Sequence, residues 1–399
     1  MTRLQWRTAG ESHGPTLIGV LEGIPAGLRL DVDRVDAELS RRQKGYGRGG
    51  RMRIETDRVE ILSGWKGGLT IGSPIAFAVR NKDSVLEKLP VPTNPRPGHA
   101  DLAGCQKWGH RDPRAVLERA SARETAARVA AAGIARQVLE AFGVEVFGYL
   151  TGLGGIACRP DAWESAGDRR AEVRESSDFL SLDPEADEAM RAAVDAAKEA
   201  KDSLGGTFEI RASGLPPGLG SCASAPERLT ARLGGALFSI PAIKGVEFGI
   251  GFDVAERRGS DVHDAIVPGE PPEAFARSTN RSGGLEGGMT TGEPVVVRAA
   301  MKPIPSIRVG MPTVDLHTGE AVRATYQRSD VTSVPACSVV GEAMVALTLA
   351  EAFLEKYGGD SMDQVAASLE HHRREFAAIG RPPESEGADT DPAISPPGA

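Results

Sequence analysis

Two histidines in glycine-rich turns are the side chains of this sequence best suited to transfer a proton. His13 lies in "GESHG" at residues 10–14, and His99 lies in "RPGHAD" at residues 96–101. Histidine titrates near neutral pH, and the neighbouring glycines let a ligand approach the backbone closely. Arginines near His99 disfavour its protonated form unless a bound anion compensates for them. We therefore expect His99 to deliver a proton to an anionic ligand, with an exposed loop histidine as the alternative. At His13 the local sequence favours a structural turn histidine, and the alternative is a histidine in a turn that a ligand approaches closely.

The first of these turns also matches G-x-S-x-G, the nucleophile elbow of α/β-hydrolases. That elbow needs a strand before the serine, a helix after it and a central sheet that is already built. Only nine residues precede Gly10, and Pro15 begins a turn and a strand. The sequence therefore disfavours Ser12 as a nucleophile.

A cationic, glycine-rich loop spans residues 41–53. It contains six basic residues and no acidic one: Arg41, Arg42, Lys44, Arg48, Arg51 and Arg53. Such a run repels itself unless anions or acidic partners neutralise it, and arginine binds carboxylates and phosphates through paired hydrogen bonds. We expect this loop to bind anionic groups. The alternatives are a solvated loop and, because "GYGRGGR" resembles an RGG segment, a minor RNA-binding role.

Three further stretches offer polar groups to a ligand. "NRSGGLEGGMTTGEP" at residues 280–294 can bring backbone N–H groups against an anion or a planar ring. "MKPIPSI" follows a predicted strand and supplies Lys302 and Ser306. "YQRSDVTSVPA" places Arg328 close to Asp330, which local sequence alone explains as a salt bridge.

The elements that must position these residues follow from hydrophobic periodicity. Alternating and apolar stretches predict strands at residues 17–22, 57–65, 73–81, 207–212, 245–254 and 294–301. Helical spacing predicts helices at residues 33–42, 126–142, 185–202 and 340–357, the second of them introduced by a capping box of Ser121 and Glu124. We expect residues 88–114 to form an ordered functional loop. The mixed order of elements, without a βαβ rhythm or an internal repeat, predicts one α+β domain.

Composition bounds the class of protein. The chain is 40% hydrophobic with a formal charge of −8, which argues against an overall nucleic-acid-binding or membrane-binding surface. The four cysteines lie far apart without a C-x-x-C pair, so we expect no metal site, no disulfide framework and a reducing compartment. No signal peptide and no apolar run of about 20 residues is visible. The proline-rich, acidic stretch at 380–399 predicts a disordered tail after a domain at 1–379.

Taken together, these stretches resemble the chorismate synthase family. "GESHGPTLIGVLEGIP", "ERASARETAARVAAAGI" and "RSDVTSVPACSVVGEAM" are similar to its three signatures, and the cationic loop, "RPGHAD", "GGLEGGMTTG" and "MKPIPS" match further blocks in the family's order. The resemblance implies a β-α-β sandwich with helices held between antiparallel sheets. It also implies a cytoplasmic, typically homotetrameric lyase that makes chorismate from 5-enolpyruvylshikimate 3-phosphate, the last step of the shikimate pathway. Reduced FMN is required although the reaction has no net redox change.

The same resemblance implies roles for individual residues. His13 matches the histidine proposed to protonate the leaving phosphate, His99 the one that protonates the reduced flavin at N1, and Asp330 the acid that helps to remove the ring proton. Arg42 and Arg48 match arginines that line the substrate and pyridine-nucleotide site, which leaves open whether NADPH reduces the flavin in this enzyme. The positions that match flavin contacts are Arg119, Ala120, Ser121, Pro241, Ala242, Gly287, Lys302, Pro303, Ile304, Pro305, Ser306 and Arg328.

Some parts of the chain depart from the family pattern. Ala120 stands where serine is usual and Pro241 where asparagine is frequent, so we expect both to contact a flavin through backbone or shape. The stretch at residues 155–205 and the tail after residue 380 match least. For both stretches the sequence leaves open either oligomer contacts or no function.

Overall fold

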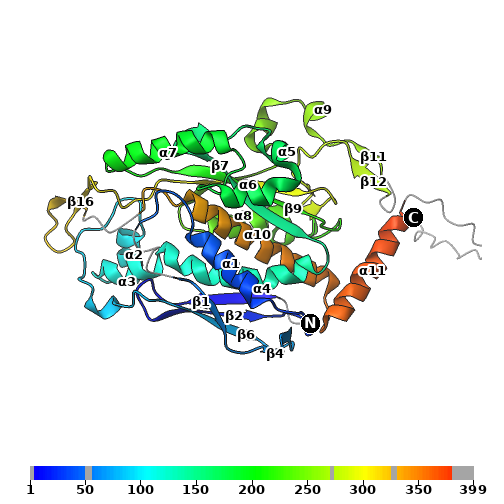
Figure 1. Ribbon diagram of the computed structural model, residues 1–399, viewed down its shortest axis with the longest axis horizontal. Coiled ribbons are helices and arrows are strands. Elements are labelled where there is room, and N and C mark those ends of the chain that lie inside the picture. The colour runs from blue at the N-terminus through cyan, green and yellow to red at the C-terminus, as the bar shows by residue number, and fades with distance from the viewer. Residues whose placement is uncertain (1–3, 50–55, 270–273, 325–329, 380–399) are drawn as a thin grey trace, which may run out of the picture.

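The computed structural model describes residues 4–49, 56–269, 274–324 and 330–379. Two antiparallel sheets enclose a layer of helices (Figure 1). The first sheet has the strand order β1-β2-β6-β3, formed by Gln5–Ala9, Thr16–Glu22, Ile75–Arg80 and Val59–Ile61. The second has the order β10-β15-β9-β7-β8, formed by Ile243–Phe248, Val295–Met301, Gly206–Ser213, Glu145–Leu153 and Ile156–Ala157. The predicted α+β sandwich is confirmed.

The helical layer consists of α1, α4, α8 and α10, which span Val32–Gln43, Thr125–Glu140, Leu229–Phe238 and Val334–Tyr357. α4 packs on the first sheet, α10 packs on the second, and the two helices contact each other. Glycines permit this close packing: a Cβ on Gly133 of α4 would meet Val35 of α1 at 3.1 Å, and one on Gly341 of α10 would meet the Phe208 ring at 2.4 Å. Both sheets therefore share one core with these helices.

α10 is longer than the sequence predicts, because it begins at Val334 rather than at residue 340. It is buried on nearly every side, so its apolar residues do not follow the one-sided spacing of an amphipathic helix. Its length and composition would suit a membrane span, but 94% of its most apolar window is buried inside the protein. That burial is typical of the central helix of a globular core.

The two sheets are halves of a repeat that the sequence analysis missed. "GIPAGL" at 23–28 in the first half corresponds to "GLPPGL" at 214–219 in the second. In the same way "GGLTIGSP" at 67–74 corresponds to "GGMTTGEP" at 287–294. In the first half the Thr70 hydroxyl donates to the carbonyl of Pro25 (2.6 Å) and accepts from the amide of Leu28 (3.0 Å). In the second half Thr290 does the same to Pro216 (2.7 Å) and Leu219 (2.8 Å). The expectation of no internal repeat was wrong, because few residues besides glycine, proline and threonine are shared.

The order of elements repeats with these hydrogen bonds. The first half runs β1, β2, α1, β3, the hairpin β4–β5, β6 and α4; the second runs β7, β9, α8, β10, the hairpin β13–β14, β15 and α10. The hairpin strands are Trp65–Lys66 with Leu69–Thr70 and Leu285–Glu286 with Met289–Thr290. The halves differ most between their first two strands. Residues 10–15 connect β1 to β2, whereas the connection from β7 to β9 contains β8 and the helices α5, α6 and α7 at Ala162–Ala166, Arg170–Ser176 and Pro184–Glu199.

Other predicted elements agree with the structure to differing degrees. The strands expected at 17–22, 207–212 and 294–301 and the helices expected at 33–42 and 185–202 lie close to their predicted bounds. The stretch at 88–114 is not a loop throughout, because it contains α2 at Asp101–Trp108 and the start of α3 at Pro113–Arg119. The remaining described elements are α9 (Gly259–Val262), β11 (Ile266–Pro268), β12 (Phe275–Arg277), β16 (Pro312–Val314), β17 (Ala321–Arg323) and α11 (Met362–Ala378).

Two local predictions were wrong. Ser121 does not form a capping box with Glu124; it caps a 3₁₀ turn at Ala122–Glu124 by accepting from the amide of Arg123 (3.3 Å). The Glu124 carboxylate instead accepts from Arg128 Nε (2.8 Å). The strand expected at 245–254 ends with β10 at Phe248, and a 3₁₀ segment follows. The tail at 380–399 lies outside the described residues.

Candidate active site

A cavity of about 500 Å³ lies between the two halves of the repeat. The cationic loop lines one side of it, and α7, the turn after α7, residues 306–308 and residues 330–331 line the others. Three sequence-predicted site residues, Arg48, Ser306 and Asp330, lie in its wall. Its volume is within the range of about 300–1,000 Å³ that is usual for small-molecule sites.

Asp330 is fixed in the cavity wall by one ion pair and two hydrogen bonds. Arg48 Nε lies 3.2 Å from one carboxylate oxygen, which also accepts from the Ser333 hydroxyl (2.8 Å). The other oxygen accepts from the amide of Gly49 (2.5 Å). Both side chains are largely buried, so this salt bridge is also a charged pair facing a ligand-sized space. An anion that bound Arg48 would change the partners of Asp330 at the same moment.

Arg42 lies behind the cavity wall. Its Nε donates to the Thr125 hydroxyl (3.0 Å), its Nη2 donates to the carbonyl of Ala122 (2.8 Å), and Nη1 lies 3.6 Å from Asp57. Burial, followed by the positive charges of neighbouring arginines, lowers the pKa of Arg42 to about 10. Arg42 therefore ties the end of α1 to the turn that precedes α4. The solvated-loop alternative is wrong for Arg41, Arg42 and Arg48, whose side chains are largely buried, whereas Lys44 is exposed. Arg51 and Arg53 lie outside the described residues.

The turn that carries His13 is pinned from two sides. The Asn81 amide, at the end of β6, donates to the carbonyls of Glu11, Ser12 and Gly14. The backbone of α3 holds the other side, because its Glu118 carbonyl accepts from the amide of Ser12 (3.1 Å). Ser12 is buried, and a strand rather than a helix follows it. The nucleophile-elbow alternative therefore does not describe this turn.

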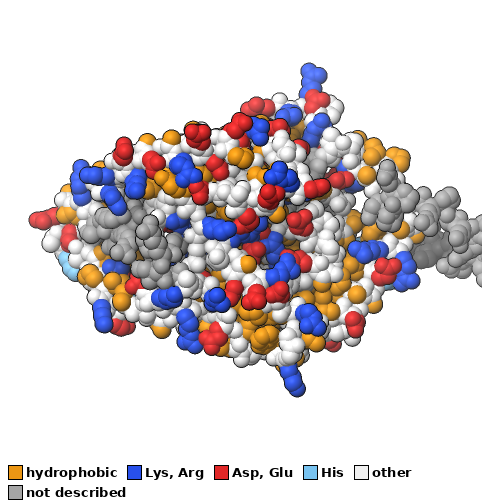
Figure 2. All heavy atoms as spheres, viewed as in Figure 1, with side chains coloured by type: hydrophobic (Ala, Val, Ile, Leu, Met, Phe, Trp, Pro, Cys, Tyr) orange, Lys and Arg blue, Asp and Glu red, His pale blue; other side chains and the backbone are white. Residues whose placement is uncertain are grey.

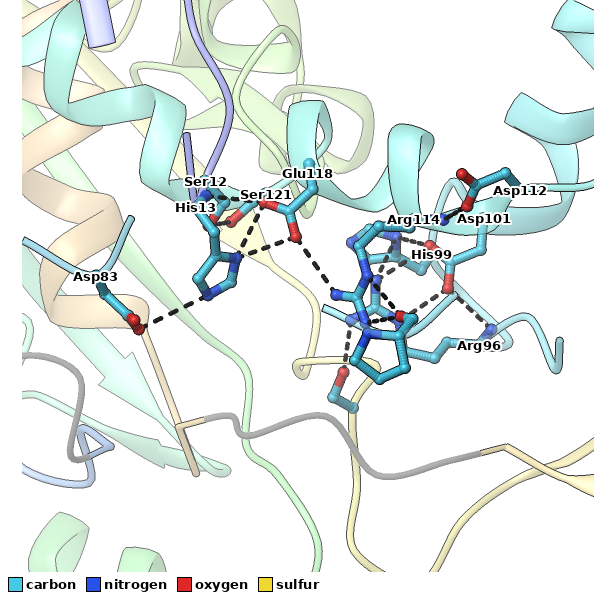
Figure 3. A network of polar contacts seen from close by, with 12 residues as sticks. Ser12, His13, Asp83, Arg96, His99, Asp101, Asp112, Arg114, Glu118 and Ser121 are labelled. Atoms are coloured by element: carbon cyan, nitrogen blue, oxygen red, sulfur yellow. Dashed lines mark hydrogen bonds and ion pairs between the residues drawn. The ribbon is translucent and has the colours of Figure 1, made fainter. Parts of the chain in front are cut away.

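A buried carboxylate holds the His13 ring (Figure 3). His13 Nδ1 lies 3.0 Å from both oxygens of Glu118, and the His13 amide donates to one of them (2.8 Å). Arg114 Nη1 lies 3.4 Å from the other oxygen. Nε2 points to Asp83, whose carboxylate lies 3.9 Å away. Burial alone would raise the pKa of Glu118, but the hydrogen bonds and charge of His13 bring it below its ordinary value.

His99 is held in the same manner just before α2. Its Nδ1 lies 2.6 Å from Asp101 Oδ1, and Arg96 donates to both oxygens of that carboxylate through Nε (2.8 Å) and Nη2 (3.0 Å). Burial would raise the pKa of Asp101, but hydrogen bonds from His99 and Arg96 hold it well below its usual range. Arg96 Nη1 also donates to Ser306 Oγ (2.9 Å), which links this network to the cavity wall.

The flavin-contact positions implied by resemblance fall into three groups. Arg119 and Ser121 lie beside the His13 turn: Arg119 donates to the carbonyls of Gly10 and Thr8, and the hydroxyls of Ser121 and Ser12 lie 3.1 Å apart. Ala120 lies between them as the C-cap of α3. Arg328 lies outside the described residues.

The second group joins the end of β15 to the His99 loop. The Lys302 amide donates to the carbonyl of Ala242 (3.0 Å), and its ammonium donates to the carbonyl of Gly98. Pro241 precedes Ala242, whose φ of 74° is rare for a non-glycine residue. Burial, followed by the charge of Lys244, lowers the pKa of Lys302. A partly buried ammonium without a carboxylate partner among the described residues suits an anionic or electron-rich ligand.

The third group consists of residues 303–306, which continue from Lys302, and of Gly287, which lies apart from them. Pro303, Ile304 and Pro305 lead from Lys302 to Ser306, and the carbonyl of Ile304 accepts from the Ser203 hydroxyl (2.7 Å). Gly287 lies in the β13–β14 hairpin, where a Cβ would meet Met289 and Cys222. No hydrogen bond or ion pair between the described residues ties Gly287 to either histidine network.

Sequence reasoning missed the side chains that orient the two histidines. Glu118 and Asp101 were quoted only inside motifs, and Asp83 was not considered. Arg114 and Glu118 stand four residues apart, which is the spacing of a helical ion pair, but this signal was hidden because the stretch looked like a loop. Within the described ranges, no cluster of three or more His, Cys, Asp or Glu side chains could hold a metal ion.

The chain is similar to known proteins over nearly its whole length. The family model described as chorismate synthase matches residues 4–354. Proteins named chorismate synthase from Rubrobacter xylanophilus and Desulforudis audaxviator are 53% and 51% identical to this chain, covering 95% and 94% of it and 99% and 98% of their own lengths. A solved structure titled "Crystal Structure of Chorismate Synthase" is 40% identical, with a TM-score of 0.77 over 95% of this chain and 99% of that one.

Proposed function

The chain belongs to the chorismate synthase family, and we propose that it is a lyase that converts 5-enolpyruvylshikimate 3-phosphate into chorismate and inorganic phosphate with reduced FMN bound. The observation that carries the proposal is the cavity whose wall contains the Arg48–Asp330 pair and is linked through Ser306 to a carboxylate-held histidine. The second histidine held by a carboxylate is His13, whose ring contacts Glu118 of α3. α3 packs against α2, the helix that follows His99.

The charge of the cavity fits that of the substrate. The substrate carries a phosphate and two carboxylates. The described cavity wall presents four cationic side chains and three carboxylates, so its cations outnumber its anions by one: Arg48, Lys198, Lys201 and Arg308 against Asp195, Asp202 and Asp330. A largely buried arginine offers a bidentate grip on such groups, and partial exclusion of water strengthens it. The proposal leaves two sources of electrons for the flavin: NADPH bound by this protein, or an external reductant.

The reaction is a trans-1,4-elimination. A ring C–H bond breaks and its electron pair forms a new double bond, the ring double bond shifts, and the C–O bond to phosphate breaks with its pair going to the leaving oxygen. His13 Nε2 would give a proton to that phosphate, Asp330 would take up the ring proton, and His99 would hold a proton toward the flavin. Bound reduced FMN would supply electron density transiently, without net redox change.

The described residues fit a flavin. Lys302 offers a partly buried ammonium, and Ala242 and residues 303–306 offer backbone groups and small side chains. The Lys302 ammonium also donates to the carbonyl of Gly98, which brings the neighbouring His99 close to this wall. The Arg119 side chain is half-exposed and donates to the carbonyl of Gly10 in the His13 turn, so a phosphate or carboxylate can reach it from solvent. These groups would hold the ring and its phosphate in the manner implied by the family.

An anaerobic assay tests the function directly. Wild-type protein should release chorismate and phosphate from the substrate with reduced FMN and neither with oxidised FMN. Equal turnover with oxidised flavin under strict anaerobiosis would contradict the proposal. Labelling of Ser12 by a fluorophosphonate would instead support a hydrolase, and salt-dependent retention on RNA without either result would support the RNA-binding alternative.

We also propose a homotetramer in the cytoplasm with a catalytic domain at residues 1–379. The outer face of the second sheet is covered by α5–α7, whereas that of the first is bare (Figure 1). Figure 2 shows hydrophobic side chains gathered along the edge of the molecule formed by this sheet. Ile18 is 43% exposed and Val20 39% there, beside the small residues Ala76 and Ala78. Four free cysteines support a reducing compartment.

Mass measurement in solution tests the assembly. Val20→Lys should lower the mass of the particle without unfolding the monomer, because Val20 already faces outward. Val314→Lys, at a similarly exposed valine of β16, is the matched control and should leave the mass unchanged. A monomeric wild type would contradict the tetramer and leave the catalytic proposal standing.

A further inference from the structure

Glu118 is the most deeply buried charged side chain in contact with either histidine ring, with a relative side-chain exposure of 1%. Among the described residues, the partners of this carboxylate are donors or cations: the His13 ring, the His13 amide and Arg114. The carboxylate therefore acts as an ionised acceptor, and its lowered pKa agrees with that state. A buried charge of this kind is costly unless its partners hold a fixed geometry.

We infer that Glu118 is a positioning residue that keeps the proton of neutral His13 on Nδ1, so that Nε2 is the ring nitrogen that exchanges a proton with the ligand. The inference rests on the proposed function for the identity of that ligand, but the geometry is independent of it. An ionised carboxylate 3.0 Å from Nδ1 can only accept, so Nδ1 must donate. The second contact, from the His13 amide to the same carboxylate, fixes the backbone and ring together.

The charged groups around His13 divide between its two nitrogens. Glu118 and Arg114, both on α3, face the Nδ1 side, and Arg119 at the end of α3 binds the carbonyl of Gly10 behind the turn. Asp83, in the segment after β6, faces Nε2 at 3.9 Å, which is beyond hydrogen-bonding distance. Asp83 is therefore a charge near the reacting nitrogen, whereas Glu118 is the bonded partner of the other nitrogen.

The Asp101 pair shows why Glu118 is the informative case. Asp101 is bonded by Arg96 through two side-chain donors, and Arg96 Nη2 also lies 3.1 Å from His99 Nδ1. Replacing Asp101 would therefore disturb an arginine and a histidine together. Glu118 has only a long contact to Arg114, whose other donors bind the carbonyl of Pro90. Changing Glu118 thus acts mainly on His13.

The first test reads the tautomer without substrate. Wild-type protein labelled with ¹⁵N-histidine, with the His13 signal assigned by its loss in His13→Asn, should show neutral His13 protonated at Nδ1. Protonation at Nε2 instead would overturn the inference. This measurement needs no Glu118 variant, so it holds even if such variants fold poorly, and it does not depend on whether chorismate is formed.

The second test compares Glu118→Gln with Asp112→Asn in the anaerobic assay. Glu118→Gln should lower kcat by about 10- to 1,000-fold with KM within threefold, because an amide can hold the wrong tautomer and cannot stabilise the imidazolium. The basic limb of its pH–rate profile should move to lower pH. Asp112→Asn removes an equal charge from the N-cap of the same helix, where asparagine can still accept from the Arg114 amide, and should stay within threefold. Equal losses in both variants, or a wild-type kcat in Glu118→Gln, would overturn the inference. A wild type that forms no chorismate would overturn the proposed function and leave the tautomer result intact.

Discussion

The two halves of the repeat share the order of their strands, hairpins and helices, but the connections between their first two strands differ in length and in function. Between β1 and β2 the chain turns within residues 10–15, and this turn carries His13. Between β7 and β9 it builds α5–α7, which covers the outer face of the second sheet and lines the cavity through Val194, Asp195 and Lys198. The duplicated elements thus form a scaffold, and the candidate chemistry depends on what was not duplicated.

The approaches to α4 and α10 show the same divergence at single positions. Ser121 stands four residues before the first residue of α4, and Asp330 stands four residues before that of α10. Ser121 contacts the hydroxyl of Ser12 in the His13 turn, whereas Asp330 binds Arg48 across the cavity. Matched positions therefore supply a neutral hydroxyl on one side of the site and a carboxylate on the other. This difference suits a reaction in which one side gives a proton and the other accepts one.

The largest expected effect tests the short connection. His13→Ala should lower turnover by about 10²- to 10⁴-fold, because it removes the proposed general acid, while Ser12→Ala should retain measurable activity. The assay is chorismate release under anaerobic conditions with reduced FMN. The reverse ranking would return Ser12 to a catalytic role, and equal, small losses would move the chemistry away from this turn.

A smaller effect is expected across the cavity, where the first half supplies Arg48 and the second supplies Asp330. Arg48→Ala should weaken substrate binding by roughly ten- to a hundredfold, as expected for losing a charge-assisted contact of about 1.5–3 kcal/mol. Arg48→Lys should not restore it, because an ammonium cannot reproduce the guanidinium fork. Equilibrium binding and the Tm of the unliganded protein are the measurements. Normal binding with a lowered Tm would make Arg48 part of the scaffold.

Acid titration separates scaffold from site at the His99 network. The folded pKa of Asp101 is below its unfolded value, so its stabilising contribution is present above about pH 4 and is lost as the pH falls toward the folded value. Wild-type Tm should therefore fall as the pH drops from about 4 to 3, and Asp101→Asn should lower Tm at pH 7 and flatten that acid slope. Scanning calorimetry from pH 7 to pH 3 checks this. A variant with an unchanged slope would show that other carboxylates govern acid unfolding.

Much of this scaffold could be predicted from sequence, and the residues that orient the site could not. The strands at β2, β9 and β15 and the helix α7 follow directly from periodicity, and the blocks around His13, His99 and Asp330 indicate the site. Glu118 was missed because its partner, His13, is more than a hundred residues away and no local pattern connects them. The capping box failed because Glu124 has other partners: Arg128, four residues further along, and Thr8, which tertiary structure brings to it.

The smallest expected effect tests the long connection. The cationic loop is held by α6, α7 and the segment between them. Lys44 binds Glu175 of α6 (2.8 Å), the Tyr46 amide donates to the carbonyl of Asp178 between the helices (2.9 Å), and the Tyr46 hydroxyl donates to Asp195 of α7 (2.9 Å). Tyr46→Phe keeps the ring, which stacks under Arg191, and removes only the last of these bonds. A looser loop would be competent for binding a smaller fraction of the time, which raises the apparent KM in proportion and leaves kcat unchanged. We expect KM to rise roughly two- to fivefold, and trypsin to cleave after Lys44 and Arg48 faster in the variant until substrate is added. Asp195→Asn, which keeps a weaker acceptor, should fall between the variant and the wild type. If KM and cleavage both stay at wild-type values, α7 covers the second sheet without positioning the loop, and the two connections differ only in length.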